Sequence, residues 1–160
     1  MATVEQTKAR VKQLLTGAMG LRISQSGDAF CVDFTDASTT VRITVRDWLG
    51  GAEDGAQTVV LVQALVLQGA RPSAELFEWV AREGGSRPFG HIELHDDRHT
   101  PGTVYLMMSH TLLGDHLDEQ ELKVAMWGVL FAADSWDEEL QHRFGGRRGK
   151  DAMRQGVVCR

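Results

Sequence analysis

The sequence predicts an α+β domain in which helices pack on an antiparallel β-sheet in two layers. Several segments alternate apolar and polar residues, as half-buried strands do, and short turns join them, which favours antiparallel hairpins. Three other segments carry apolar residues at spacings of three and four, which is typical of helices. Strands gathered between helices indicate an α+β fold. The expected order is α-β-β-β-β-α-β-β-α.

One domain accounts for the length of the chain. With 160 residues, 42% of them hydrophobic, the chain can bury a core of its own. We expect this domain to cover residues 1–146, because the last long helix ends at Gly145-Gly146. Residues 147–160 then form a basic C-terminal tail that we expect to be mobile. Removal of residues 150–160 should therefore leave stability nearly unchanged.

The first half of the chain reads as a helix followed by four strands. Thr3 and Gln6 form a capping-box pair at the start of a helix over residues 3–19. Strand patterns follow at residues 21–25, 30–34 and 41–46, and the second of these is expected to be half-buried, with Phe34 on its apolar side and Cys31 on its polar side. A glycine-rich loop after Trp48 leads to a long apolar strand over residues 58–67, which is expected to be central.

The second half begins with a helix that ends at Glu83. Pro72 and Ser73 suit its first turn, and its buried side is expected to be formed by three apolar residues, Leu76, Phe77 and Val80. Two strands follow, over residues 90–95 and 103–112, with a polar turn between them.

A long helix from Asp118 to Phe144 completes the domain. Asp118 and Glu121 suit a helix start, because their side chains can accept hydrogen bonds from the unpaired backbone amides there. Its apolar stripe is expected to cover the protein's own sheet and consists of Leu122, Met126, Val129, Ala133, Trp136, Leu140 and Phe144. The segment 124–133 is uncharged all round, yet is far shorter than the roughly 20 residues that span a bilayer. Trp127 and Phe131 lie off the stripe, so either core or an interface with a second protein chain explains them.

Histidines and acidic residues in two places could support metal binding or catalysis, but a structural explanation is favoured for each. His91 and His95 would lie about 13 Å apart on one face of a strand at ~3.3 Å per residue, too far apart for one metal ion. The cluster continues with Asp96, Asp97 and His99. Its polar residues are explained by a position on the solvent-exposed face of a hairpin. A second group comprises His110, Asp115 and His116, and acids at a helix start explain Asp115. We therefore predict no catalytic residues, no metal and no cofactor.

Charge and cysteine content limit the partners. The net charge is −5, although the end of the chain is basic, and a short basic tail is weak evidence for nucleic acid. We expect neither nucleic acid nor membrane as a partner.

The cysteines indicate a reducing compartment. Cys31 and Cys159 have no metal-ligand spacing and are expected to be separate thiols. Charged residues interrupt any apolar run near Met1, so we expect a cytoplasmic protein.

Several short motifs resemble a known bacterial family. They are Arg87-Pro88-Phe89-Gly90, the run from Ser109 to Asp115, Ala132-Ala133-Asp134, and the run from Glu139 to Gly146. Together with the element order, they are similar to type III secretion chaperones and, more closely, to YbjN-like peptide-binding chaperones (TY-Chap-like domains). The resemblance implies a small, non-enzymatic and often dimeric protein that binds extended peptide segments on apolar patches.

The leading hypothesis is a chaperone-like protein-binding module that holds apolar peptide segments of partner proteins and forms a homodimer. Its candidate peptide or dimer interface consists of Trp127, Phe131, Met107 and Trp48. An alternative is a YbjN-type regulatory or sensory domain that acts through protein contacts. A less favoured alternative is a metal-binding protein or enzyme that uses the region of His91, His95 and His99.

Overall fold

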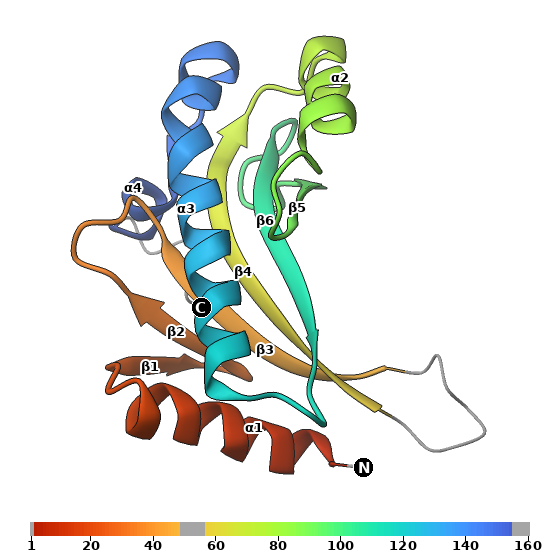
Figure 1. Ribbon diagram of the computed structural model, residues 1–160. Helices are drawn as coiled ribbons and strands as arrows, with labels where there is room; N and C mark the ends of the chain where they lie inside the picture. Colours follow the sequence, from red (N-terminus) through yellow and green to blue (C-terminus); the bar gives the residue numbers. More distant parts are fainter. Residues whose placement is uncertain (1, 49–56, 155–160) are drawn as a thin grey trace.

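A twisted antiparallel sheet forms the centre of the computed structural model, which describes residues 2–48 and 57–154 (Figure 1). Neighbouring strands pair in the order β1-β2-β3-β4-β6-β5, and β7 pairs with β4 beside this path. The strands are β1 (Ile23–Ser26), β2 (Ala29–Asp33), β3 (Thr40–Trp48), β4 (Gln57–Ala70), β5 (His91–Asp96), β6 (Val104–Leu113) and β7 (Arg147–Arg148). The predicted central position of the long apolar strand is thus confirmed for β4.

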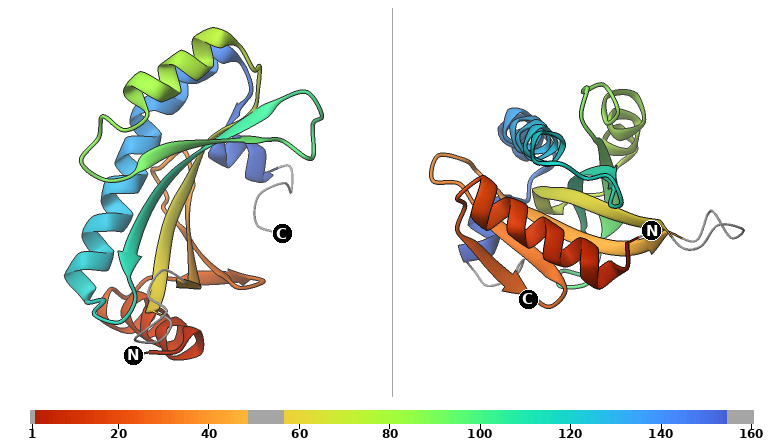
Figure 2. Two further views of the ribbon diagram at one scale, coloured as in Figure 1. Left: turned by 90° about the vertical axis from the view of Figure 1, so that its right-hand side faces the viewer. Right: turned by 60° about the horizontal axis from the view of Figure 1, so that its bottom comes forward.

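Three helices lie on one side of the sheet, which we call the helix face. They are α1 (Val4–Gln13), continued by the π-helical turn η1 (Leu14–Ala18), α2 (Ala74–Glu83) and α3 (Glu119–Phe144). Figure 2 shows α2 and α3 together on this side, with α1 across one end, whereas α4 (Gly149–Arg154) lies on the opposite side. The predicted two-layer α+β class and element order are confirmed, with β7 and α4 as additions.

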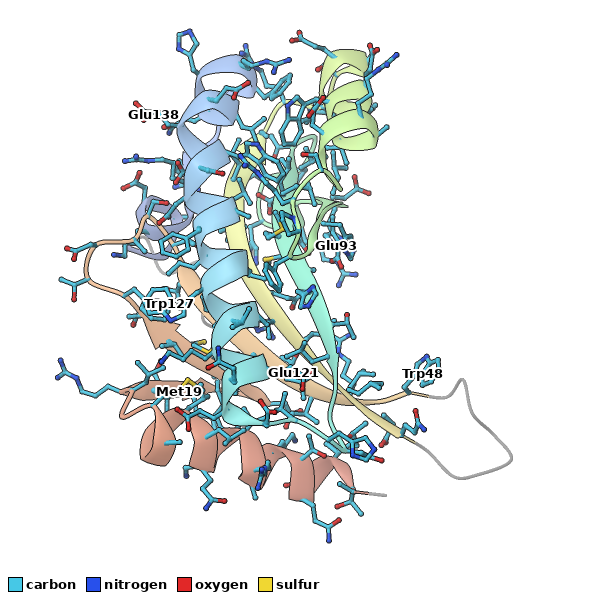
Figure 3. The ribbon with its side chains drawn as sticks, viewed as in Figure 1. Met19, Trp48, Glu93, Glu121, Trp127 and Glu138 are labelled. Atoms are coloured by element: carbon cyan, nitrogen blue, oxygen red, sulfur yellow. The ribbon has the colours of Figure 1, made fainter. Side chains whose placement is uncertain are left out.

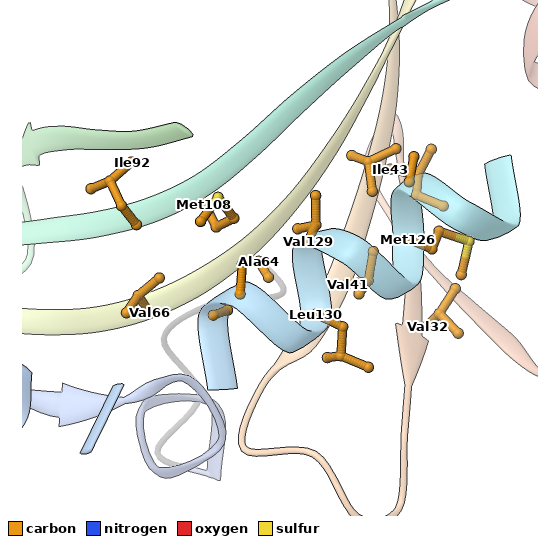
Figure 4. Packing of buried hydrophobic residues seen from close by; sticks show 14 of the residues in the cluster. Val32, Val41, Ile43, Ala64, Val66, Ile92, Met108, Met126, Val129 and Leu130 are labelled. Atoms are coloured by element: carbon orange, nitrogen blue, oxygen red, sulfur yellow. The ribbon is translucent and has the colours of Figure 1, made fainter. Parts of the chain in front are cut away.

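The stripe of α3 covers the sheet as predicted. Asp118 caps the helix by accepting a hydrogen bond from the Glu121 amide at 2.7 Å. All seven stripe residues from Leu122 to Phe144 are buried, and Figure 4 shows Met126 and Val129 against Ile43 of β3. Each fully buried large apolar side chain stabilises the fold by about 1.5–3 kcal/mol. The contact between α3 and the sheet is therefore the main apolar interface of the domain.

The buried side of α2 differs from the prediction. Leu76 is buried, but Phe77 is 50% exposed and Val80 is only half-buried, while Trp79 takes the inner position at 8% exposure. Trp79 packs edge-on against Trp136 of α3, with ring centroids 5.3 Å apart. The larger indole of Trp79 thus occupies the inner position that the sequence pattern assigned to Phe77.

The strand β2 is buried on both faces rather than on one. Cys31 is 1% exposed, and Phe30 and Val32 on the helix face are also buried. The strand lies between β1 and β3, and Cys31 is flanked by Ser24 on one side and by the longer Arg42 on the other. The glycine-rich loop expected after Trp48 falls on residues 49–56, and that loop and Cys159 lie outside the described residues.

Residues 147–154, which the sequence analysis assigned to a basic tail, form β7 and α4. After Ala64, β4 no longer pairs with β3. β7 pairs with β4 on this side instead, with Arg147 opposite Gln68 and Arg148 opposite Leu67. Gly146 makes the turn possible with φ +85°, and a Cβ there would lie 2.6 Å from the Gln68 carbonyl oxygen. Ala152 of α4 is fully buried. The folded domain therefore continues beyond Gly146.

Candidate protein-binding surface

Three aromatic side chains meet on the outer side of α3, and we call Phe34, Trp127 and Phe131 the aromatic patch. The rings of Trp127 and Phe131 stack with centroids 5.7 Å apart and planes 24° apart. The Phe34 ring lies 4.8 Å from Trp127, tilted by 51°. Trp127 is 37% exposed and Phe131 is 64% exposed. Both side chains are therefore exposed rather than buried in the core.

Trp127 and Phe131 come together because residues four apart share one side of a helix. Phe34 joins them from a distant part of the chain, just after β2 ends at Asp33. The alternating pattern placed Phe34 within the strand, so its role in the patch was missed. No local signal could have found this contact, because it depends on how the segment after β2 folds over α3.

The segment between β2 and β3 is fastened at both sides. Asp134 of α3 accepts a hydrogen bond from the Ser38 amide at 2.9 Å and another from the Ser38 hydroxyl. The Lys150 ammonium of α4 donates to the Phe34 carbonyl oxygen at 2.6 Å and to that of Thr35 at 3.2 Å. The Lys150 amide also donates to the Ser38 carbonyl oxygen at 2.7 Å. The C-terminal segment thus helps to hold Phe34 against Trp127.

A groove of about 180 Å³ lies next to the aromatic patch. Its lining residues are Ala18, Met19, Leu21, Phe34, Glu119, Lys123, Met126 and Trp127. Figure 3 shows Met19 and Trp127 on the same side of the molecule. Methionine side chains adapt to different apolar shapes, and the two charged side chains can orient a bound segment. The patch and groove together offer a continuous apolar surface with a polar margin.

A second groove, of about 440 Å³, runs along the other side of α3. Phe89, His110, Leu112, Glu121 and Val124 are among its lining residues. Phe89 packs so closely on α3 that a Cβ at Gly128 would lie 2.6 Å from its Cβ and Cγ atoms. This contact explains a glycine in the middle of a helix, where it is otherwise unfavourable by about 1 kcal/mol relative to alanine.

His110 on this groove has a lowered pKa. Its burial is the main cause, the nearby charge of His91 adds to it, and Glu121 acts in the opposite direction. The His110 ring packs edge-on against Phe89 with centroids 5.8 Å apart. The folded protein therefore binds a proton at His110 less readily than the unfolded chain does.

His110→Gln is expected to reduce the loss of stability as the pH falls from about 7 to about 5. In the wild type, the unfolded state takes up a proton on His110 at higher pH than the folded state, so acidification favours unfolding. Urea denaturation at a series of pH values measures the slope. His116→Gln, on an exposed histidine nearby, is the matched control. Equal slopes for the wild type and His110→Gln would contradict the prediction.

The four predicted interface residues do not form one surface. Trp127 and Phe131 belong to the aromatic patch, but Met107 is half-buried on the sheet face opposite the helices. Trp48 is 47% exposed at the end of β3, and Figure 3 shows it on the other side of the view from Trp127. Only the pair on α3 therefore belongs to the candidate surface.

His91 of the first histidine cluster lies near His110 of the second and contributes to its lowered pKa. His91 and His95 each approach Glu93, with nitrogen–oxygen distances of 3.4 and 3.0 Å. Across residues 2–48 and 57–154, no three metal-ligating side chains come together, so the region of His91, His95 and His99 forms no such site there. Asp115 accepts hydrogen bonds from the Ala2 amide and the Thr58 hydroxyl, each at 3.2 Å, whereas His110 packs on Phe89.

The acidic residues near the C-terminal end of α3 differ in burial. Asp137 is 3% exposed, and burial raises its pKa above the usual range, with Arg148 acting in the opposite direction. Glu139, in contrast, faces outward and pairs with Arg143 at 3.1 Å.

Within the described segments, no helix is both long and apolar enough to cross a membrane.

Comparison with known proteins places the fold and the family. The crystal structure of YbjN, "a putative transcription regulator from E. coli", superposes with a TM-score of 0.58 at 12% identity, over 85% of this chain and 93% of that chain. None of the curated proteins matches the chain. The family described as T3SS (YopN, CesT) and YbjN peptide-binding chaperone 1 matches residues 5–152, which include β7 and most of α4. The chain therefore belongs to this family of peptide-binding chaperone domains, TY-Chap1.

Proposed function

We propose that this protein is a non-enzymatic binding module that holds an apolar segment of a partner protein on the aromatic patch. The observation that carries the proposal is the exposed, stacked pair of Trp127 and Phe131 beside an apolar groove. Exposed aromatic side chains that gather in one place are typical of protein-binding sites, because they bury a large apolar area at a small entropic cost. The family description as peptide-binding chaperones supports the same function.

The shape of the surface suggests how a segment binds. The groove is lined by Met19, Leu21 and Trp127, which suits one apolar side chain of the partner. A second apolar side chain packs on Phe131, which is the most exposed large apolar residue in the described part of the chain. Glu119 and Lys123 at the groove form polar contacts with the partner's backbone or side chains. An extended segment with two spaced apolar residues fits this arrangement.

Trp127→Ala with Phe131→Ala is expected to weaken binding of such peptides at least tenfold, because aromatic residues at interfaces often contribute about 2 kcal/mol or more. The measurement is fluorescence anisotropy with labelled peptides that carry two large apolar residues at varied spacing. Phe77→Ala is the matched control, because Phe77 is 50% exposed but lies on α2. The control should bind as the wild type does.

Three outcomes would contradict the proposal. If the double variant loses its native far-UV circular dichroism spectrum, the pair supports the fold rather than a partner. If Phe77→Ala weakens binding equally, the peptides bind any exposed aromatic residue. Binding by the wild type that neither substitution changes would place the peptide site elsewhere.

We also propose a homodimer in the cytoplasm. The second copy and a partner segment would then use neighbouring parts of the apolar surface, and light scattering over a range of protein concentrations measures the association. A regulatory or sensory role through protein contacts is the alternative, and it is favoured by the similarity in fold to YbjN. Comparison of secreted proteins and of transcripts in a deletion strain separates the two roles.

A further inference from the structure

A cavity of about 490 Å³ opens on the sheet face opposite α3, far from the aromatic patch. Arg42 of β3, Leu65 of β4 and Met107 of β6 contribute to its wall. Leu65 pairs with Met107, while their neighbours Ala64 and Met108 point toward α3 on the other face (Figure 4). The turn between β5 and β6 closes the cavity with Asp97 and Arg98. Its volume is within the range of small-molecule sites.

Two residues that line this cavity each carry a buried oxygen atom without a hydrogen-bond donor. Gln68 and Asp97 both line it, and their side chains are 4% and 3% exposed. In the described part of the chain, four buried side-chain oxygens lack a protein partner, and the Gln68 Oε1 and Asp97 Oδ2 atoms are two of them. The other carboxylate oxygen of Asp97 accepts from the His99 amide at 2.9 Å. A buried acceptor without a donor is unfavourable, so a bound group that donates hydrogen bonds would stabilise this arrangement.

The charges around the cavity indicate what kind of group fits. The two aspartates, Asp96 and Asp97, and the two arginines, Arg42 and Arg98, give formal charges that cancel. The unpartnered acceptors are buried, whereas Arg42 and Arg98 are exposed. A cation therefore suits the buried part and an anion suits the outer part. Leu65 and Met107 add an apolar wall between them.

We propose that this cavity binds a small zwitterion of the α-amino-acid type. The ammonium group donates to Asp97 and Gln68, and its three N–H donors are enough for both oxygens. The carboxylate accepts from the guanidinium groups of Arg42 and Arg98, a pairing that suits arginine geometry. An unbranched apolar side chain lies on Leu65 and Met107. This site is independent of the aromatic patch, so its failure would leave the proposed function unchanged.

The test is isothermal titration calorimetry of the full chain with L-methionine and two analogues. L-Methioninamide lacks the carboxylate, and N-acetyl-L-methionine lacks the ammonium group. Saturable binding of L-methionine at millimolar concentration is expected, and each analogue should bind at least about tenfold more weakly, because each loses charge-assisted hydrogen bonds. Absence of saturable binding by L-methionine, or equal binding of all three compounds, would overturn the proposal.

Substitutions locate the site. Asp97→Asn and Arg98→Gln are each expected to weaken L-methionine binding at least about tenfold while the circular dichroism spectrum stays native. Asp137→Asn is the matched control, since Asp137 is equally buried and also has an oxygen without a partner, but it does not line the cavity. Binding that survives Asp97→Asn, or that Asp137→Asn weakens as much, would show that the ligand is held elsewhere.

Discussion

Trp136→Ala is expected to lower the free energy of unfolding by about 3–5 kcal/mol, as truncation of a large buried aromatic residue does. Trp136 is 7% exposed and packs edge-on against Trp79, so it joins α3 to α2. The Arg87 guanidinium also lies 4.7 Å from the centre of the indole ring. The substitution removes all of these contacts and leaves a cavity between the two helices. Urea denaturation followed by circular dichroism measures the change.

Trp48→Ala is the control for this experiment. Trp48 is 47% exposed at the end of β3, so its removal should cost less than about 1 kcal/mol. If the two tryptophan variants are equally unstable, the contact between α2 and α3 is not the reason for the effect of Trp136→Ala.

Truncation after Gly146 is expected to destabilise the protein by about 2–4 kcal/mol and to lower its melting temperature by roughly 5–15 °C. The truncated chain loses β7, which leaves the edge of β4 at Leu67 and Gln68 unpaired. It also loses Ala152 from the core and the hydrogen bonds from Lys150 to the segment that holds Phe34. This result would reverse the expectation of an untied tail. Differential scanning calorimetry measures the transition.

A second truncation, after Arg154, keeps β7 and α4 and isolates their contribution. Lys150→Met is a milder test, because it removes the ammonium group and retains the apolar stem. This variant should weaken peptide binding at the aromatic patch even if the melting temperature changes little. An unchanged melting temperature after truncation at Gly146 would show that the C-terminal segment contributes nothing to stability.

Local signals predicted much of the fold. The Asp118 cap, the regular stripe from Leu122 to Phe144 and the glycine pair at 145–146 each depend on residues near in sequence, and α3 begins and ends where they indicate. The strands of the central sheet were likewise visible, because alternation of apolar and polar residues reflects a sheet with one buried face. The motifs that follow α2 indicated the family that the match over residues 5–152 shows.

The failures share one physical cause, which is dependence on distant contacts. A strand as short as β7 and a helix as short as α4 show no periodicity in the sequence. β7 is stabilised by pairing with β4, and α4 packs against β4. Phe77 and Trp79 are both apolar residues on α2, and only the position of Trp136 decides which of them is buried. Only part of the aromatic patch could be predicted, for the same reason. Trp127 and Phe131 were visible as a helical pair, whereas Phe34 was not.

The hydrogen bond between Lys150 and Phe34 joins positions that are 116 residues apart. Ribosomes add residues from the N-terminus onward, so Phe34 emerges long before its partner on α4 exists. Trp127 and Phe131 also emerge before residue 150, and during that interval the aromatic patch lacks its third fixed ring. A growing chain therefore completes the aromatic patch only after residue 150 has been added.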